Sequence, residues 1–328
     1  MFPITRRAAI GLALVLAAPL AAATDAAAQT KLKWAHVYET SEPFHTQSVW
    51  AAQEIAKRTN NRYQIDVFPA SQLGKEADIN QGLSLGTVDM IISGSSFAAR
   101  AFPPIGVTYY PYIFRDPQHL LTFAKSDVFQ NLAKGYEEKT GHHIVSLSYY
   151  GTRHTSSNKP VKTCADMKGL KIRVPDAPAY LAMPRACGAN PTPIAFAEVY
   201  LALQNGTVDA QENPLTTIEA KKFFEVQKHI VLTGHIVDSL NTIVSKSVWS
   251  KLSAEDKQIF TEVTQEAAAR STQEIQVKEK ELVEGFRQRG LTVTEVNTAE
   301  FRDTVLKAVT PESAGYRKAD WEAIQALK

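Results

Sequence analysis

The first hundred residues alternate strand and helix patterns, and this order restricts the fold more than any other feature. We predict strands at 31–36, 63–68 and 88–92, with helices at about 44–59 and 75–86 between them. Parallel neighbouring strands need a crossover connection, usually a helix, and such crossovers are almost always right-handed. The order therefore predicts an α/β fold with a parallel sheet.

The second half of the chain repeats this alternation. Apolar residues alternate with charged ones at 170–174, which predicts a strand that Pro175 ends. The elements predicted next are a helix around 178–187, a turn at 191–193, a helix at 196–205 and a strand at 208–214. The sequence Gly-Thr-Val-Asp closes a helix and opens a strand at both 86–89 and 206–209. We therefore expect two similar α/β lobes.

Three segments are suited to connect the lobes. Residues 144–150 predict a strand that continues extended to 158, and residues 237–246 predict a strand that returns. Ser253-Ala-Glu-Asp256 is a capping-box pattern that opens a helix reaching Gly290. At ~1.5 Å per residue this helix spans roughly 50 Å, enough to brace both lobes. A kinked pair of helices is the alternative.

The division into lobes follows from a predicted crossing at Tyr150-Gly151. We place residues 29–150, with about 239–275, in lobe 1. Residues 151–238, with about 276–328, form lobe 2. A strand at 291–296 and two helices complete the chain.

The first 28 residues have the features of a secretory signal peptide. Two arginines precede an apolar run at 8–20, and Ala-x-Ala cleavage sites end at Ala23 and Ala28. The run is too short to span a bilayer, and no later stretch is apolar enough to do so. We expect export, to the periplasm in a cell with two membranes. The formal net charge of +2 gives no basic field for nucleic acid.

The chain has two cysteines, Cys164 and Cys187. An exported chain permits a disulfide between them, and two small buried thiols are the alternative. No Cys or His spacing indicates zinc, so we expect neither a metal nor a cofactor.

The sequence lacks the common patterns of hydrolases and phosphate-binding enzymes. HExxH, GxSxG and a glycine-rich phosphate loop are all missing. We therefore expect a binding protein rather than an enzyme. A periplasmic lyase or isomerase that uses His36 and Glu39 is the alternative.

The candidate binding residues fall at strand ends and in polar loops of both halves. Arg173 ends a strand, where open α/β sheets place their ligands, and its planar fork of donors matches a carboxylate. A surface salt bridge is the alternative. Arg153 is a second candidate cation, and Asn213 is restricted to extended backbone because Pro214 follows it. The remaining candidates are His36, Glu39, Glu76, Ser95, Asp176, Phe196 and Gln211.

Several of these segments together resemble the solute receptors of TRAP transporters, the DctP family. The most specific are Asp-Met-Lys-Gly-Leu-Lys-Ile-Arg-Val-Pro at 166–175 and Val-Asp-Ala-Gln-Glu-Asn-Pro at 208–214. Segments 69–74, 151–158, 191–204 and 225–228 agree as well, so the resemblance covers essentially the whole mature chain. It implies a two-lobed periplasmic-binding-protein fold with crossing strands and a long helix. It also implies a receptor that closes on an organic acid and delivers it to sodium-driven membrane subunits.

The resemblance also implies roles for individual residues. Arg173 matches the arginine that pairs with the ligand carboxylate, and Arg153 matches a second basic contact. Asn213 matches an amide that binds the same carboxylate, and Phe196 matches an aromatic wall. The positions that vary with the ligand are Glu76 and Asp176. The chain departs from sialic-acid receptors at Gly94 and in the loop from His36 to Glu39, which argues against a bulky amino sugar acid.

The expected charges of the cleft narrow the ligand. Glu39, Glu76 and Asp176 would lie beside the two arginines, and like charges roughly 4 Å apart repel by about 4 kcal/mol at an effective dielectric of 20. A second ligand carboxylate is therefore unfavourable, whereas sugar hydroxyls bind carboxylates well. We predict a monocarboxylate sugar acid such as a hexuronate or aldonate, with C4-dicarboxylates and keto or hydroxy acids as the alternative. We expect the receptor to be a monomer.

Overall fold

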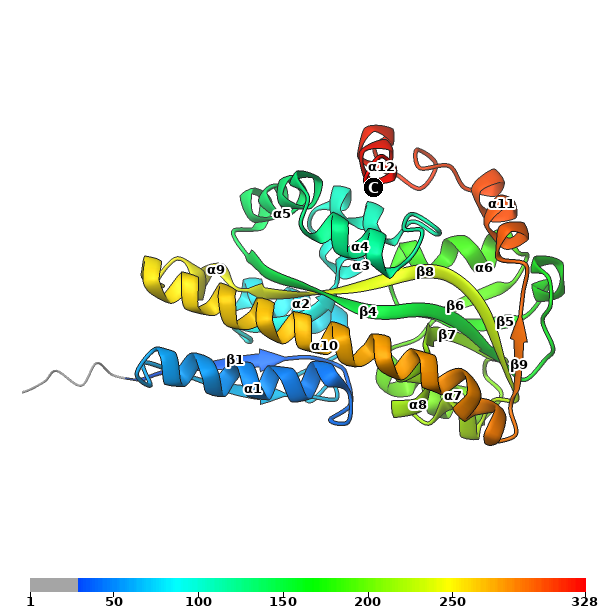
Figure 1. Cartoon of the computed structure of the whole chain (residues 1–328), viewed down its shortest axis with the longest axis horizontal. Helices are drawn as coiled ribbons and strands as arrows, with labels where there is room; N and C mark the ends of the chain where they lie inside the picture. Colours follow the sequence, from blue (N-terminus) through cyan, green and yellow to red (C-terminus); the bar gives the residue numbers. More distant parts are fainter. Residues whose placement is uncertain (1–28) are drawn as a thin grey trace, which may run out of the picture.

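Two long antiparallel strands, β4 (His143–Ser157) and β8 (His229–Val244), run through the centre of one mixed sheet (Figure 1). The structure is a computed structural model that describes residues 29–328, so the predicted signal peptide lies outside the described residues. The strand order is β2-β1-β3-β8-β4-β7-β5-β6, and β9 pairs with β8. Because β4 and β8 belong to both ends of the sheet, they join its two halves.

The first half of the chain builds one end of the sheet in the predicted order. β1 pairs in parallel with both β2 and β3, which requires the helical crossovers α1 and α2. The elements of this half are β1 (Thr30–Ala35), α1 (Pro43–Arg58), β2 (Tyr63–Phe68), α2 (Glu76–Leu85), β3 (Met90–Gly94), α3 (Ser95–Ala98), a 3₁₀ helix at Pro103–Tyr109, α4 (Pro117–Ala124) and α5 (Asp127–Thr140).

The second half builds the other end of the sheet in the same way. β5 pairs in parallel with β6 and β7, and β7 joins β4. The elements are β5 (Lys171–Val174), α6 (Ala182–Ala186), β6 (Asn190–Pro193), α7 (Val199–Gln204), β7 (Ala210–Pro214), α8 (Leu215–Ala220), α9 (Lys246–Trp249), α10 (Ala254–Gln288), β9 (Thr292–Glu295), α11 (Thr298–Ala308) and α12 (Lys318–Gln325), with 3₁₀ turns at Cys164–Met167, Pro178–Leu181, Phe196–Glu198 and Phe223–Glu225.

The repeated Gly-Thr-Val-Asp motif has the same structure in both halves. Gly86 and Gly206 are in the left-handed region, with φ of 73° and 69°, where glycine avoids the steric cost of a Cβ. The aspartate of each motif precedes its strand, and its main-chain amide donates to the carbonyl of a lysine in the neighbouring strand. Asp89 donates to Lys33 at 3.0 Å, and Asp209 donates to Lys171 at 2.8 Å. The motif therefore reports a real internal similarity.

The long helix is continuous and contacts both halves. α10 has 35 residues and begins at a Ser253 cap whose Oγ accepts from the Asp256 amide. Near its start, Glu262 pairs with Arg58 at 2.5 Å, and just after its end Arg289 pairs with Glu219 of α8 at 2.7 Å. Figure 1 shows α10 crossing the molecule along β4. The alternative of a kinked helix pair is thus not seen.

Two local predictions were wrong in the second half. Residues 191–193, predicted as a turn, belong to β6, which tolerates two prolines because it is the edge strand next to β5. The helix predicted from Phe196 begins with a 3₁₀ turn and becomes α-helical only at Val199. Both errors concern short elements whose form depends on neighbouring strands.

A disulfide joins Cys164 and Cys187 across 23 residues. Both cysteines are buried in a small core of the second half with Met167, Leu170 and Ile172. The structure therefore contains the bridged form of the two alternatives. Among residues 29–328, no helix has the length and apolar character needed to cross a membrane.

Candidate ligand-binding site

A small cavity lies where the two halves of the sheet meet. Its volume is about 20 Å³, which is space for about one water molecule. The first half and the central strand β8 contribute Val37, Tyr38, Glu76 and Leu240, and the other lining residues are Tyr150, Arg153, Arg173, Pro175, Tyr180, Phe196 and Asn213. Five of the ten ligand-binding candidates predicted from the sequence therefore line this cavity, namely Glu76, Arg153, Arg173, Phe196 and Asn213.

Arg173 enters the cavity from the third residue of β5 and is 2% exposed. Its Nε and Nη2 both donate to the carbonyl of Ile194, at 2.9 and 2.7 Å. Nη1 is buried without a hydrogen-bond partner, and within residues 29–328 no carboxylate pairs with this guanidinium. Burial lowers the pKa of Arg173 to about 10, so the side chain remains a cation at neutral pH. The end of its fork is therefore free to receive an anion.

Arg153 is also buried, but its charge is compensated. Its Nε donates to Glu212 Oε2 at 2.5 Å, Nη2 donates to Glu212 Oε1 at 2.8 Å, and Nη1 donates to Asp238 Oδ2 at 2.8 Å. His235 Nε2 lies 3.0 Å from Glu212 Oε2, the oxygen that accepts from Arg153 Nε. Arg153 lies within the long strand β4, beside a register irregularity. It lines the cavity as part of a closed ionic network.

Asn213 is held between this network and a second amide. Its Oδ1 accepts from Arg153 Nη2 at 3.1 Å, and its Nδ2 donates to Gln211 Oε1 at 2.6 Å. Gln211 in turn donates to Ser156 Oγ at 2.8 Å. Gln211 is fully buried and does not line the cavity, so it orients Asn213 from behind.

Aromatic side chains form much of the cavity wall. Phe196 has Arg173 6.0 Å from its ring centroid and Lys221 Nζ at 5.1 Å. Arg153 lies 4.9 Å from the ring of Tyr180, whose hydroxyl accepts from Ser96 Oγ at 3.2 Å. Tyr38 and Tyr150 meet edge to face, 5.2 Å apart. These contacts combine apolar surface with a few hydroxyl groups, as in small-molecule sites.

Glu76 is the candidate carboxylate that reaches the cavity. It begins α2, and its Oε1 accepts from Ser93 Oγ and from the Gly94 amide, both at 3.2 Å. Asn80 also donates to Ser93 Oγ, at 2.8 Å. Burial raises the pKa of Glu76 to about 7, so part of the population is protonated at neutral pH. Glu76 can then accept or donate a hydrogen bond.

The other candidates lie outside the cavity lining. Glu39 pairs with Lys221 at 2.6 Å, and Asp176 is more than half exposed and pairs with Arg100 at 3.1 Å. His36 is buried against His45, and Ser95 Oγ accepts from Asn241 Nδ2 at 2.7 Å. Of the three acids expected beside the arginines, only Glu76 is therefore there. Glu39 and Asp176 pair with Lys221 and Arg100 instead.

The sequence interpretation missed the acids and the tyrosines of the site. Glu212 and Asp238 compensate Arg153, and Tyr38, Tyr150 and Tyr180 form the wall. Glu212 adjoins Asn213, and Tyr150 adjoins the predicted crossing at Gly151, so position along the chain was an available signal. For Asp238 and Tyr180 no such signal exists, because only the folded sheet brings them near Arg153.

The charges of the site favour one anionic group. The two arginines face two paired carboxylates and Glu76, and only Arg173 among the described cavity residues is a cation without a carboxylate partner. An unpaired buried guanidinium is costly and is stabilised by an anion in its fork. The described residues include no cluster of three or more His, Cys, Asp or Glu that could hold a metal ion.

Comparison with known proteins gives consistent matches over nearly the full length. Residues 34–314 match the DctP family, described as bacterial extracellular solute-binding protein, family 7. The sialic acid-binding periplasmic protein SiaP of Vibrio cholerae is 35% identical over 286 residues, which is 87% of this chain and 89% of that protein.

Solved structures agree with the sequence match. A TRAP periplasmic solute-binding protein of Polaromonas sp. JS666, bound to D-erythronate, is 31% identical with a TM-score of 0.87, over 92% of this chain and 99% of that one. One from Roseobacter denitrificans OCh 114, bound to L-galactonate, is 30% identical with a TM-score of 0.84, over 90% and 98%. This chain therefore belongs to the DctP family, the two-lobed periplasmic solute receptors of TRAP transporters.

Proposed function

We propose that this receptor binds a sugar acid with a single carboxylate, such as an aldonate or hexuronate. The observation that carries the proposal is the free end of the Arg173 fork, the one uncompensated cation of the described cavity lining. A monocarboxylate neutralises this cation. A second carboxylate would meet Glu76 and the paired Glu212 and Asp238 instead of another free cation.

The remaining groups of the cavity suit hydroxyls. Glu76 can accept or donate, and Tyr38, Tyr150 and Tyr180 add hydroxyl groups around an aromatic wall. Asn213 has one amide hydrogen left after its bond to Gln211, and it lies beside Arg153. Relatives that bind D-erythronate and L-galactonate support a polyol acid as the ligand.

Binding requires the lobes to separate and close. A cavity with room for one water is far smaller than a six-carbon acid, so the ligand enters when the halves are apart. Contacts across the cleft then hold the closed form: Glu39 with Lys221 at 2.6 Å, Glu42 with Thr217 at 2.9 Å, and Arg100 with Asp176. The ligand shifts the population toward closure because it links both halves.

The lobes that move are proposed as predicted from the sequence. Lobe 1 comprises residues 29–150 with about 239–275, and lobe 2 comprises 151–238 with about 276–328. β4, β8 and α10 cross between them, so these three elements must bend during opening. The mature receptor acts as a monomer in the periplasm, presents its ligand to the membrane subunits and leaves it chemically unchanged.

A thermal-shift screen followed by calorimetry tests the ligand. The panel includes L-galactonate, D-galacturonate, D-erythronate, N-acetylneuraminate, succinate and malate. We expect stabilisation by an aldonate or hexuronate, with micromolar or tighter affinity. Stabilisation by succinate or malate without any sugar acid would overturn the proposal. Incubation with the best ligand, followed by chromatography, tests the absence of turnover, and formation of a product would show an enzyme.

A further inference from the structure

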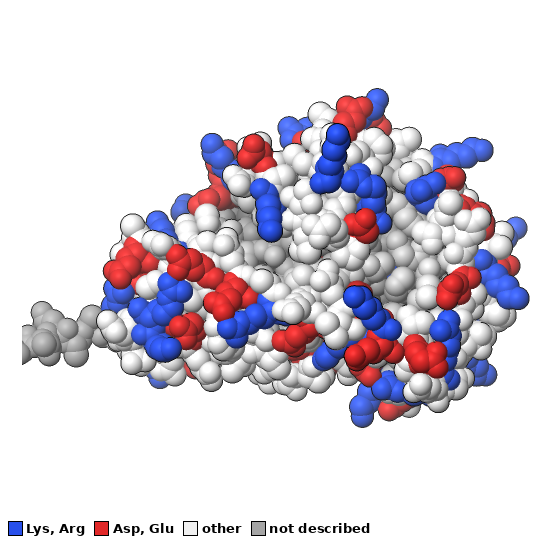
Figure 2. All heavy atoms as spheres, viewed as in Figure 1, with Lys and Arg blue, Asp and Glu red and all other residues white. Residues whose placement is uncertain are grey.

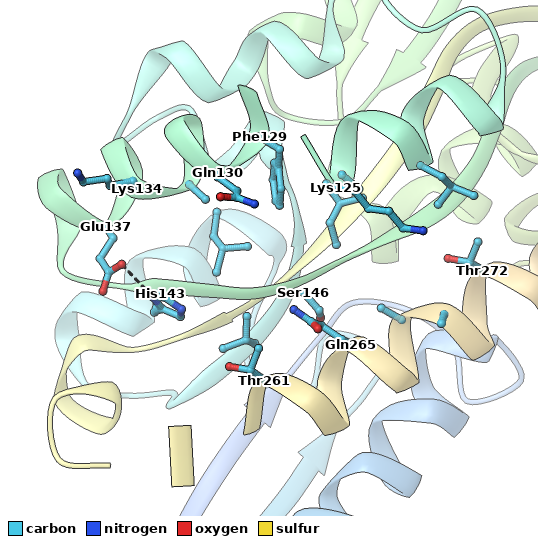
Figure 3. Close-up of a pocket in the computed structure, with 18 of the residues that line it drawn as sticks. Lys125, Phe129, Gln130, Lys134, Glu137, His143, Ser146, Thr261, Gln265 and Thr272 are labelled. Atoms are coloured by element: carbon cyan, nitrogen blue, oxygen red, sulfur yellow. Dashed lines mark hydrogen bonds and ion pairs between the residues drawn. The ribbon is translucent and has the colours of Figure 1, made fainter. Parts of the chain in front are cut away.

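A second and larger cavity than the one at Arg173 is a groove lined by none of the predicted ligand-binding residues. It measures about 890 Å³ and lies between α4 and α5 on one side and α10 on the other, with the start of β4 as its floor (Figure 3). Figure 2 shows a mostly uncharged hollow in this part of the surface. Its lining includes the five consecutive strand residues His143, Ile144, Val145, Ser146 and Leu147.

Five consecutive strand residues line a groove when the groove meets the strand along its edge, because successive side chains point to opposite faces. β4 pairs with β8 from His143 to Ser157, but with β7 only from Arg153 to Ser157. Among the residues described, the second edge of β4 from 143 to 152 therefore has no neighbouring strand. The groove is open to the first five residues of this edge.

Side chains of α10 cover only the later part of the edge. Thr272 Oγ1 accepts from the amide of Tyr149 at 3.1 Å, and Glu279 Oε1 accepts from the amide of Thr152 at 2.8 Å. Register is regular from Ser146 to Tyr149, and amides two residues apart point to the same edge. The amide and carbonyl of Leu147 therefore face the groove, next to the end that Thr272 closes.

A second observation also points to an occupant. Ser146 is 5% exposed, and its Oγ is buried without a hydrogen-bond partner among the described residues. Ser146 and Gln265 of α10 both line the groove (Figure 3). A buried hydroxyl normally has a hydrogen-bond partner, so Ser146 Oγ is an unsatisfied polar group directly beneath the surface of the groove.

The charge of the groove selects among occupants. Glu137 pairs with His143 at 2.8 Å, and Lys134 has Glu138 at 3.8 Å. Lys125 forms no ion pair with any described residue. The glutamines and threonines of α10 are neutral, so the groove has one uncompensated cation. It thus favours an extended segment that carries an acidic side chain.

We propose that this groove binds an extended, acidic segment of a partner protein, which adds as a strand to the edge of β4 at His143–Leu147. Main-chain hydrogen bonds to the edge give the affinity in this mode, and side-chain contacts with lining residues such as Phe129 give selectivity. Five residues at ~3.3 Å each span roughly 16 Å. The edge lies recessed between two helices, so one strand can enter whereas the whole sheet edge of a second copy cannot.

Panning a phage library of random dodecapeptides on the mature protein tests the proposal. Counter-selection uses Ala269→Trp, which fills the groove from an exposed position of α10. The matched control is Val277→Trp, because Val277 is 51% exposed on the same helix and outside the groove. Thermal unfolding followed by circular dichroism, carried out without any sugar acid, establishes that each variant is folded.

Selected peptides are measured by fluorescence anisotropy. We expect binding to weaken at least tenfold for Ala269→Trp and about threefold for Lys125→Glu, with no change for Val277→Trp. Hydrogen exchange at the Leu147 amide should slow when peptide binds. The proposal fails if no peptide is enriched, if Ala269→Trp binds as well as the wild type, or if exchange at Leu147 is unchanged. It also fails if the groove instead mediates self-association, seen by ultracentrifugation and lost in Ala269→Trp.

Discussion

The two halves of the molecule use the same scaffold but bring side chains of opposite charge to the cavity between them. In each, a Gly-Thr-Val-Asp turn leads into a buried strand, β3 or β7, that passes directly into a short helix, α3 or α8. The first half brings the carboxyl of Glu76 to the cavity, whereas the second half brings Arg173. The fold therefore fixes where a side chain reaches the cavity, and in the proposed function the residue at each position decides what is recognised.

A second contrast lies between the two arginines. Arg153 meets Glu212 and Asp238, whereas Arg173 meets the Ile194 carbonyl and has a donor left over. Both are buried, but from their surroundings we expect Arg153 to act mainly in the stability of the protein and Arg173 in the proposed binding of the ligand. Variants of the two residues should separate these roles.

The largest effect is expected for the stability of Arg153→Ala. The change leaves Glu212 and Asp238 buried without their cation, and breaking a buried pair in this way costs about 3–5 kcal/mol. Urea denaturation followed by circular dichroism measures the loss. Arg173→Ala is the matched control and should lose much less, because no described carboxylate depends on Arg173. Equal losses for the two variants would contradict the contrast.

Arg173→Ala should mainly reduce affinity for the ligand. Removing a cation that meets a carboxylate in a closed cleft costs on the order of 3 kcal/mol, roughly a hundredfold or more in Kd. Arg173→Lys should recover little, since an ammonium lacks the planar pair of donors. Calorimetry with the best sugar acid gives both values. Near-normal binding by Arg173→Lys would rule out recognition by the fork.

The sequence predicted the fold better than the surroundings of the site. Strand alternation, the Gly86 and Gly206 turns and the capped long helix are local signals, so they predicted the sheet and α10. Arg173 was predicted as a candidate because a strand end and Pro175 mark it locally, and it lines the cavity. The pairing of Arg153 was not predictable, since Asp238 comes from β8, 85 residues away. Asp176 was expected at the ligand because it follows Arg173 and Pro175 in the sequence. Its contact with the distant Arg100 has no local signal.

Glu76→Gln should change how stability depends on pH. Burial raises the pKa of Glu76 from 4.5 to about 7, so the folded protein holds a proton that the unfolded chain releases. Stability of the wild type therefore falls as pH rises from about 4.5 to 7, and the full penalty is present above 7. Glutamine does not titrate, so it removes this pH dependence, and its side-chain oxygen can still accept from Ser93 and Gly94.

The measurement compares unfolding free energies of wild type and Glu76→Gln at pH 5 and pH 8. The variant should gain on the order of 2 kcal/mol relative to the wild type between the two pH values. Glu138→Gln, at an exposed position of α5, is the control and should show no such gain. A difference that does not vary with pH would mean that Glu76 is ionised throughout.

The smallest effect is expected for Asp176→Asn at the rim of the cleft. Asp176 is 53% exposed and pairs with Arg100, which is 45% exposed, and pairs of this kind contribute about 0.2–1 kcal/mol. Losing the pair weakens the closed form slightly, so Kd for the sugar acid should rise by less than about fivefold. Arg100→Gln should have an equal or slightly larger effect, since it removes the same pair and also the Arg100 donation to the main-chain carbonyl of Asp176. A different outcome is that Asp176→Asn weakens binding tenfold or more and Arg100→Gln does not. That result would mean that Asp176 contacts the ligand directly, so that Glu76 is not the only acid at the binding site.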